Sequence, residues 1–90
     1  MNGGVLSVLL DACAYLALEP ALGDDEDAVS HDLHISMLRP VMIGDRVDLR
    51  GELVQKGRRV AFVNSEARVD GRLVASARIT KSIVQKPPTA

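Results

Sequence analysis

The most distinct hydrophobic pattern in the chain is residues 4–18, where nearly every position is apolar. Such a run predicts one α-helix, and Pro20 shortly after it discourages continuation of the helix. The polar exceptions are Ser7, Asp11 and Tyr15, which are four residues apart and therefore share one stripe of the helix surface. We expect a helix that is covered on most sides and has a single polar stripe.

Beyond the helix, the spacing of apolar residues changes to a period of two. Residues 20–28 form an acidic segment, which we interpret as a solvated loop without chemistry. From position 29 to a stop near Pro40, alternate residues are apolar, which predicts a half-buried strand. One face of this strand carries Val29, His31, Leu33, Ile35 and Met37, and the other carries Ser30, Asp32, His34 and Ser36.

Further strands follow at short intervals. Alternation and turn formers predict strands over 47–53, 60–69 and 73–84, with turns at 43–45 and 55–58. Asp70-Gly71, between the last two strands, is typical of a two-residue type I′ hairpin. One apolar helix followed by hairpin-connected strands predicts an α+β fold, in which a mainly four-stranded antiparallel sheet curls around a central helix. We take 1–85 as a single domain and 86–90 as a flexible tail.

Composition narrows the functional classes. A domain of 90 residues leaves much of its surface exposed unless it pairs with another copy. A net charge of −1, with Tyr15 and Phe62 as the only aromatic residues, argues against a nucleic-acid partner. The apolar run is shorter than the roughly 20 residues that span a bilayer, so we expect no membrane partner. The start of the chain does not resemble a signal peptide, and the single Cys13 cannot form an intrachain disulfide, so we expect a cytoplasmic location.

Asp11 is the helix residue whose position most needs explaining. A carboxylate among apolar residues is costly unless it has a partner or a function. It could act on a carbonyl as general base or nucleophile, or it could simply face solvent on the polar stripe. Gly3 and Gly4 come immediately before the apolar run, where backbone N–H groups at a helix start can receive a developing oxyanion. A flexible helix start is the alternative for these two glycines.

Helix geometry keeps these two candidate groups apart. Seven residues at about 1.5 Å per residue place Gly4 about 10 Å from Asp11 along the helix axis. One carbonyl group cannot contact both within a single chain. If the two groups cooperate, they must come from different chains, which predicts a symmetric homodimer with two composite sites, or a dimer of such dimers.

The other reactive side chains suggest less. His31 and His34 fall on opposite faces of their predicted strand without a carboxylate at metal-ligand spacing, so we expect no metal site. We interpret Cys13 as a small buried hydrophobic residue, since no basic neighbour activates it. Four basic residues cluster around strand ends and a turn, and they either meet the phosphates of a nucleotide or are solvated turn charges: Arg46, Lys56, Arg58 and Arg59.

Several segments, in the same order along most of the chain, resemble the PaaI-like thioesterases, a hotdog-fold family. They are Asn-Gly-Gly-Val-Leu-Ser-Val-Leu-Leu-Asp (2–11), Ser-His-Asp-Leu-His-Ile-Ser-Met-Leu-Arg-Pro (30–40), Gly44-Asp45, Lys56-Gly57-Arg58 and Asp70-Gly71-Arg72-Leu73-Val74-Ala75. The resemblance implies a hotdog fold and hydrolysis of acyl-CoA thioesters, with no cofactor beyond the coenzyme A of the substrate.

The same resemblance suggests a role for each candidate residue. If the roles known in the family hold here, Gly3 or Gly4 donates a backbone N–H to the oxyanion. Asp11 of the neighbouring subunit then activates water or attacks the thioester. Ser30 matches a position that hydrogen-bonds the water or the carboxylate. The residues expected to bind substrate are Asn2, Tyr15, Met37, Lys56, Gly57 and Arg58, of which the last three match a turn that contacts coenzyme A.

Two departures from the family leave other functions open. Asn2 stands where the family has a histidine, which bears on substrate orientation. Relatives also have a preceding segment with a helix and at least one strand, and a domain without it would expose a sheet edge and depend on association. The alternatives are therefore a non-catalytic hotdog protein that holds an acyl or CoA-like ligand, and a structural module that pairs with a longer thioesterase subunit.

Overall fold

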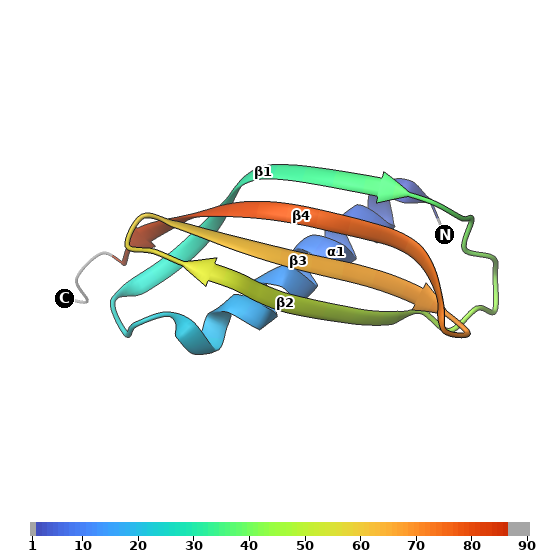
Figure 1. Cartoon of the computed structure of the whole chain (residues 1–90), viewed down its shortest axis with the longest axis horizontal. Coiled ribbons are helices and arrows are strands. Elements are labelled where there is room, and N and C mark those ends of the chain that lie inside the picture. The colour runs from blue at the N-terminus through green and yellow to red at the C-terminus, as the bar shows by residue number, and fades with distance from the viewer. Residues whose placement is uncertain (1, 87–90) are drawn as a thin grey trace.

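One long helix lies across one face of a four-stranded antiparallel sheet in the computed structural model, which describes residues 2–86 (Figure 1). The sheet order is β1-β4-β3-β2. The elements are α1 (Gly3–Leu18), the 3-10 helix η1 (Glu19–Ala21), β1 (Glu26–Met37), β2 (Asp48–Lys56), β3 (Val60–Val69) and β4 (Arg72–Gln85). The predicted α+β architecture is confirmed. Of the predicted tail, residues 87–90 lie outside the described part.

α1 begins one residue earlier than predicted because Asn2 caps it. The Asn2 side-chain oxygen accepts the Val5 N–H at 2.8 Å, which satisfies one of the free donors of the first turn. At the other end, Pro20 lies in η1, where the chain leaves the helix. By length and composition alone Gly3–Ala21 would also suit a membrane span, but one of its sides packs on the sheet as a core helix does.

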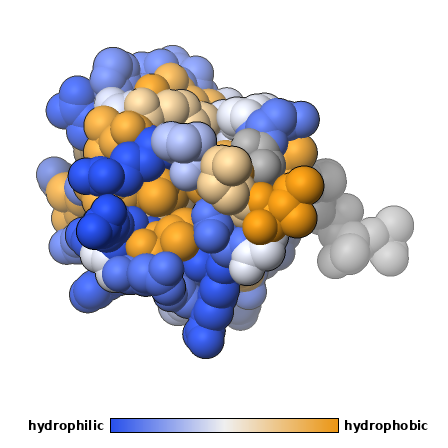
Figure 2. Space-filling model, turned by 90° about the vertical axis from the view of Figure 1, so that its right-hand side faces the viewer, coloured by the Kyte–Doolittle hydropathy of each residue, from blue (hydrophilic) through white to orange (hydrophobic). Residues whose placement is uncertain are grey.

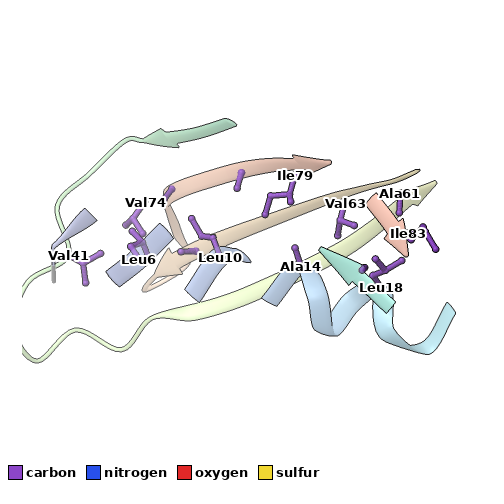
Figure 3. Close-up of a cluster of buried hydrophobic side chains, with 14 residues drawn as sticks. Leu6, Leu10, Ala14, Leu18, Val41, Ala61, Val63, Val74, Ile79 and Ile83 are labelled. Carbon is purple, nitrogen blue, oxygen red and sulfur yellow. The ribbon is translucent and has the colours of Figure 1, made fainter. Parts of the chain in front are cut away.

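The core lies between α1 and the sheet (Figure 3). The helix contributes Leu6, Leu10, Ala14 and Leu18, which are four residues apart and all buried. Facing them are Ala61, Val63 and Ala67 of β3 and Val74, Ala75, Ala77, Ile79 and Ile83 of β4. The buried Ser65 hydroxyl donates to the Leu10 carbonyl oxygen at 2.9 Å, so this polar group within the layer is satisfied.

The opposite side of α1 is uncovered in the single chain. Val8 and Leu16 are 68% and 67% exposed, and Val5 on the same side is 48% exposed. The expectation that the helix is covered on most sides is therefore wrong for one chain. A second apolar area lies in the loop between β1 and β2, where Ile43 is fully exposed, and Figure 2 shows hydrophobic patches between hydrophilic ones at this end of the molecule.

β1 departs from the predicted alternation because it contains a bulge. The strand begins at Glu26, inside the segment predicted as a loop, and its register shifts between Ser30 and Asp32. Before the bulge, Ser30 pairs with the buried Lys81, so Ser30 faces the helix. After the bulge, Leu33 pairs with the buried Ile79 and therefore occupies that same inner face. The extra residue of a bulge exchanges the two faces of a strand.

The predicted face for the start of this strand is consequently wrong. Val29 pairs with Ser82, and the His31 Nδ1 lies 2.9 Å from the Ser82 hydroxyl. His31 is thus on the outer face of the sheet and not among the apolar residues. Ser30, which the alternation assigned to the polar face, points inward toward the helix.

The remaining strands match the prediction closely. β2 begins at Asp48, one residue later than expected, and comes very close to the helix at Gly51. A Cβ atom at Gly51 would lie 2.8 Å from the Cys13 carbonyl oxygen, so only glycine fits there. Asp70 and Gly71 have φ angles of 50° and 78°, as a type I′ turn between β3 and β4 requires.

Candidate active site

Three side chains from three different elements meet beneath the helix. Asp11 of α1 accepts hydrogen bonds at its Oδ1 from the Ser30 hydroxyl (2.6 Å) and from the Lys81 ammonium (3.0 Å). The Lys81 Nζ also donates to the Ser30 hydroxyl oxygen at 2.9 Å. Since Ser30 and Lys81 are direct neighbours across the β1–β4 register, the two strands present one small polar cluster to Asp11.

The cluster is buried at one end and open at the other. The Lys81 side chain is 3% exposed, whereas the Asp11 side chain is 35% exposed. No described residue donates a hydrogen bond to Asp11 Oδ2, so one carboxylate oxygen is fixed and the other remains available. The structure thus brings Asp11 and Ser30 together, as the sequence resemblance implied.

Sequence reasoning did not single out Lys81. A signal for it exists: on the inner face of β4, Lys81 falls between Ile79 and Ile83 in the apolar alternation. A charged residue at such a position needs a partner of opposite charge. Asp11, the carboxylate in the apolar helix, is that partner.

The start of α1 forms a second candidate region. Among residues 2–86, the N–H groups of Gly3 and Gly4 meet no acceptor. The next two N–H groups do: Val5 donates to the side-chain oxygen of Asn2 and Leu6 to its backbone oxygen. Asn2, predicted to bind substrate, therefore uses its side-chain oxygen as a helix cap. Met37 lies beside Gly3, and both line a hollow of about 330 Å³ with the loop that follows β1.

Tyr15, another predicted substrate-binding residue, is engaged within the chain. Its hydroxyl donates to Asp27 Oδ1 at 2.8 Å, and this bond, followed by desolvation, raises the pKa of Tyr15. The pKa of Asp27 is lowered, first by the Ala28 N–H and then by the Tyr15 hydroxyl. The tyrosine ring lies 5.6 Å from the Lys81 Nζ, measured to its centroid, so Tyr15 borders the polar cluster.

In the turn expected to contact coenzyme A, one basic side chain is paired within the chain and another is exposed. Lys56 forms an ion pair with Glu26 at 3.0 Å, and both side chains are largely buried. The Glu26 carboxylate also accepts the Gly23 N–H, and that bond, followed by the bond from Lys56, lowers the pKa of Glu26. Segment 20–28 therefore provides one structural ion pair and several hydrogen bonds, and it is not a plain solvated loop.

Arg58, in contrast, is exposed. It lines a hollow of about 820 Å³ together with Gly57, Arg59 and the half-exposed Phe62. The Gly57 N–H is used in the turn, where it donates to the Val60 carbonyl oxygen at 2.8 Å. Arg58 and Arg59 are therefore the basic groups of this turn that can reach a ligand.

The candidate residues do not form one site within a single chain. Gly3 and Met37 lie at one end of the molecule, the β2–β3 turn with Arg58 lies at the other, and α1 carries Asp11 between them (Figure 1). The axial separation of about 10 Å between Gly4 and Asp11 follows from the continuous helix that joins them.

Two further residues have no evident part in chemistry. Burial raises the pKa of the Cys13 thiol, which disfavours the reactive thiolate. His31 is paired with Ser82, and within the described residues no three His, Cys, Asp or Glu side chains are grouped as metal ligands would be.

Comparison with known proteins identifies the family. The model of the thioesterase superfamily matches residues 1–76. The chain belongs to the thioesterase superfamily.

Relatives of known structure confirm the hotdog fold of this superfamily member. A Bacillus halodurans protein crystallised with CoA superposes with a TM-score of 0.87 at 25% identity, covering 93% of this chain and 59% of that one. A phenylacetic acid degradation-related protein from Ralstonia eutropha JMP134 gives 0.85 at 33% identity, covering 91% and 61%. The resemblance to PaaI-like thioesterases is confirmed.

Among curated proteins, mouse acyl-coenzyme A thioesterase 13 is 26% identical over 85 residues. That match covers 92% of this chain and 60% of the relative, so the chain spans about three fifths of the relative's length. These matches cover most of this chain and show its fold and its family. Its chemistry depends on Asp11 and the groups around it.

Proposed function

We propose that this chain hydrolyses an acyl-CoA thioester, with Asp11 as the catalytic carboxylate. The observation that carries the proposal is the half-exposed Asp11, whose Oδ1 is held by Ser30 and Lys81 while Oδ2 remains available. Such an arrangement fixes the direction of the reactive oxygen before substrate arrives. The name of the mouse relative and the CoA in the Bacillus halodurans structure support acyl-CoA as the substrate class.

Two routes use the same carboxylate. In the first, Asp11 Oδ2 removes a proton from a water molecule, whose oxygen attacks the thioester carbonyl. In the second, Oδ2 attacks the carbonyl itself and forms a mixed anhydride, which water then hydrolyses. In both, the carbonyl oxygen becomes an oxyanion, and collapse of the intermediate breaks the carbon–sulfur bond and expels CoA as a thiolate. The thiolate takes up the proton that Asp11 removed from water in the first route, and a proton from solvent in the second.

The oxyanion requires donors that the same chain cannot supply at Asp11. The N–H groups of Gly3 and Gly4 are suitable because they lie at the positive end of α1 and meet no acceptor in the described chain. At about 10 Å along the axis they are too far from Asp11 to share a carbonyl with it. We infer a homodimer in which Asp11 of one copy faces Gly3 and Gly4 of the other.

The same dimer would give the nucleotide part of CoA a binding region. Arg58 and Arg59 offer two guanidinium groups for phosphates, and Phe62 beside them offers an apolar face. In this proposal Lys56 holds the turn through Glu26, and the two arginines contact the ligand.

Thiol release from a panel of acyl-CoA esters tests the proposal. Asp11→Asn should lower kcat by at least about 100-fold, as removal of a general base does. Asp32→Asn is the matched control, because it removes an exposed carboxylate from β1 and should leave kcat unchanged. Equal activity of wild type and Asp11→Asn, or no thiol release by the wild type, would contradict the proposal that the chain is a thioesterase with Asp11 as its catalytic carboxylate.

Mixing two inactive variants tests the shared site. Asp11→Asn chains lack the carboxylate, and Gly4→Val chains keep the N–H group but place a branched side chain where the substrate must approach it. Each variant thus lacks one working half of every site, but a mixed dimer regains one complete site. Random exchange at equal amounts should restore about a quarter of wild-type activity, because half of the dimers are mixed and each has one of two sites intact. A site contained within one chain gives no recovery.

The non-catalytic alternative is favoured by Asn2, whose side-chain oxygen is committed to capping α1. It predicts that calorimetry detects binding of CoA or an acyl-CoA while no thiol is released. Turnover that depends on Asp11 excludes it.

A further inference from the structure

Lys81 is a cation in the core of the domain. It lies on the inner face of β4 between Ile79 and Ile83, and its side chain is 3% exposed. Its neighbours across the strands are Ser30 on β1 and Ala61 on β3. An ammonium group in such a place is retained only if the groups around it satisfy it.

All the groups that satisfy Lys81 belong to the candidate active site or border it. From α1, Asp11 faces it at 3.0 Å and the Tyr15 ring lies 5.6 Å away. From β1 the Ser30 hydroxyl faces it at 2.9 Å, and from β3 the apolar Ala61 packs beside it. Among the described residues Lys81 forms no other ion pair, so its single anionic partner is Asp11.

Two donors on one oxygen determine how the carboxylate lies. Lys81 and Ser30 both approach Asp11 Oδ1, which leaves Oδ2 on the side where no residue between 2 and 86 donates to it. A fixed orientation of Oδ2 is what the carboxylate needs in order to take a proton from water or attack a carbonyl.

We propose that Lys81 is a positioning residue for catalysis: through its bond to Oδ1 it holds Asp11 with Oδ2 directed at the substrate. The inference rests on the proposed thioester hydrolysis. Lys81 does not contact the substrate itself, since it is buried behind Asp11 and Ser30.

A role in folding alone leads to a different expectation. Lys81→Met removes one member of the ion pair, which is costly when the other charge stays buried, but Asp11 is 35% exposed and keeps contact with water. Met also has nearly the length of Lys without its charge. Lys81→Met should therefore fold, yet catalyse poorly. Arg78→Met is the matched control, because it removes a cation from the same strand at an exposed position that pairs with His34 and Asn64.

The experiment compares steady-state kinetics of these variants on an acyl-CoA ester that the wild type hydrolyses, with circular dichroism to verify folding. Lys81→Met should lower kcat about 10- to 100-fold with KM changed less than about twofold, because misorientation of a catalytic group affects the chemical step. Arg78→Met should match the wild type. Lys81→Arg, which restores the charge, should regain part of the lost kcat.

A double variant shows whether Lys81 acts through Asp11. In the Asp11→Asn background, Lys81→Met should cause no further loss, since groups that act as a unit are not additive. Lys81→Gln, which keeps N–H donors but loses the charge, is the second neutral variant.

Four results overturn the inference. Wild-type kcat in Lys81→Met while Asp11→Asn is inactive overturns it and leaves the proposed function intact. A further loss in the double variant, or failure of both neutral variants to fold, assigns Lys81 a role independent of positioning. No thiol release by the wild type removes the proposed function, and the inference with it.

Discussion

Gly51 is the position where a single added methyl group should have the clearest effect. A Cβ atom there would lie 2.8 Å from the Cys13 carbonyl oxygen and 2.9 Å from the Ala17 Cβ. The carbonyl belongs to the helix backbone and cannot rotate away, so β2 and α1 must separate by about 0.6 Å to restore an ordinary contact of 3.4 Å. Gly51→Ala therefore strains the packing between helix and sheet.

The size of the effect follows from two opposing terms. Overpacking of this kind costs about 1–3 kcal/mol. Gly51 has no positive φ, so alanine can adopt its backbone conformation, and the less flexible unfolded chain returns about 0.4–1 kcal/mol. We expect a net loss of about 1–2 kcal/mol, which lowers the Tm of a domain of this size by about 5–15 °C.

Thermal unfolding followed by circular dichroism at one fixed protein concentration measures this shift. Gly23→Ala is the control, because the nearest atoms to its added Cβ lie at 3.4 Å or more, which is ordinary van der Waals contact. Its Tm should equal or slightly exceed that of the wild type. A Gly51→Ala variant that melts within about 1 °C of Gly23→Ala would refute the close contact between β2 and the helix.

Three further outcomes follow from individual contacts. Ser65→Ala should lower stability by about 1 kcal/mol in chemical denaturation, because it removes the buried hydroxyl that donates to Leu10; a loss below about 0.3 kcal/mol contradicts this. Asn2→Ala should lower stability by about 1 kcal/mol through loss of the helix cap, while Asn2→Asp, which can still cap, should stay close to wild type. Because the pKa values of Glu26 and Asp27 are lowered in the fold, their stabilisation is present at neutral pH and is lost as the pH falls below about 4. The Tm of the wild type should therefore fall more steeply between pH 5 and 3 than that of a Glu26→Gln, Asp27→Asn variant, and parallel curves would contradict the assignment.

Local patterns in the sequence predicted most of the fold because they have local physical causes. The apolar run, the proline after it and Asp70-Gly71 act on their immediate neighbours, so the helix and the β3–β4 turn were found within a residue or two. The bulge in β1 has no such local signal. Whether one extra residue is accommodated depends on pairing with β4, and for this reason alternation assigned Ser30 to the wrong face.

The candidate site was predictable only in part for the same reason. Asp11 is visible in the sequence because its own neighbours are apolar, and the resemblance added Ser30. Lys81 becomes meaningful only when β4 is known to lie under α1 next to β1. Its alternation with Ile79 and Ile83 marked it as buried, but no local rule joins it to a helix so distant in the chain.

The pair formed by Asp11 and Lys81 spans 70 positions of sequence, from α1 to β4. During synthesis the helix leaves the ribosome before β4, and its carboxylate lacks the Lys81 cation until β4 is made and docks between β1 and β3. Contacts of such large sequence separation are also the slow ones to form in free folding. The charge pair is therefore among the last contacts completed, and a chain that has closed only the β2–β3 hairpin carries Asp11 without its counterion. The proposed thioester hydrolysis, followed during refolding, would therefore report the docking of β4 and not the formation of the helix.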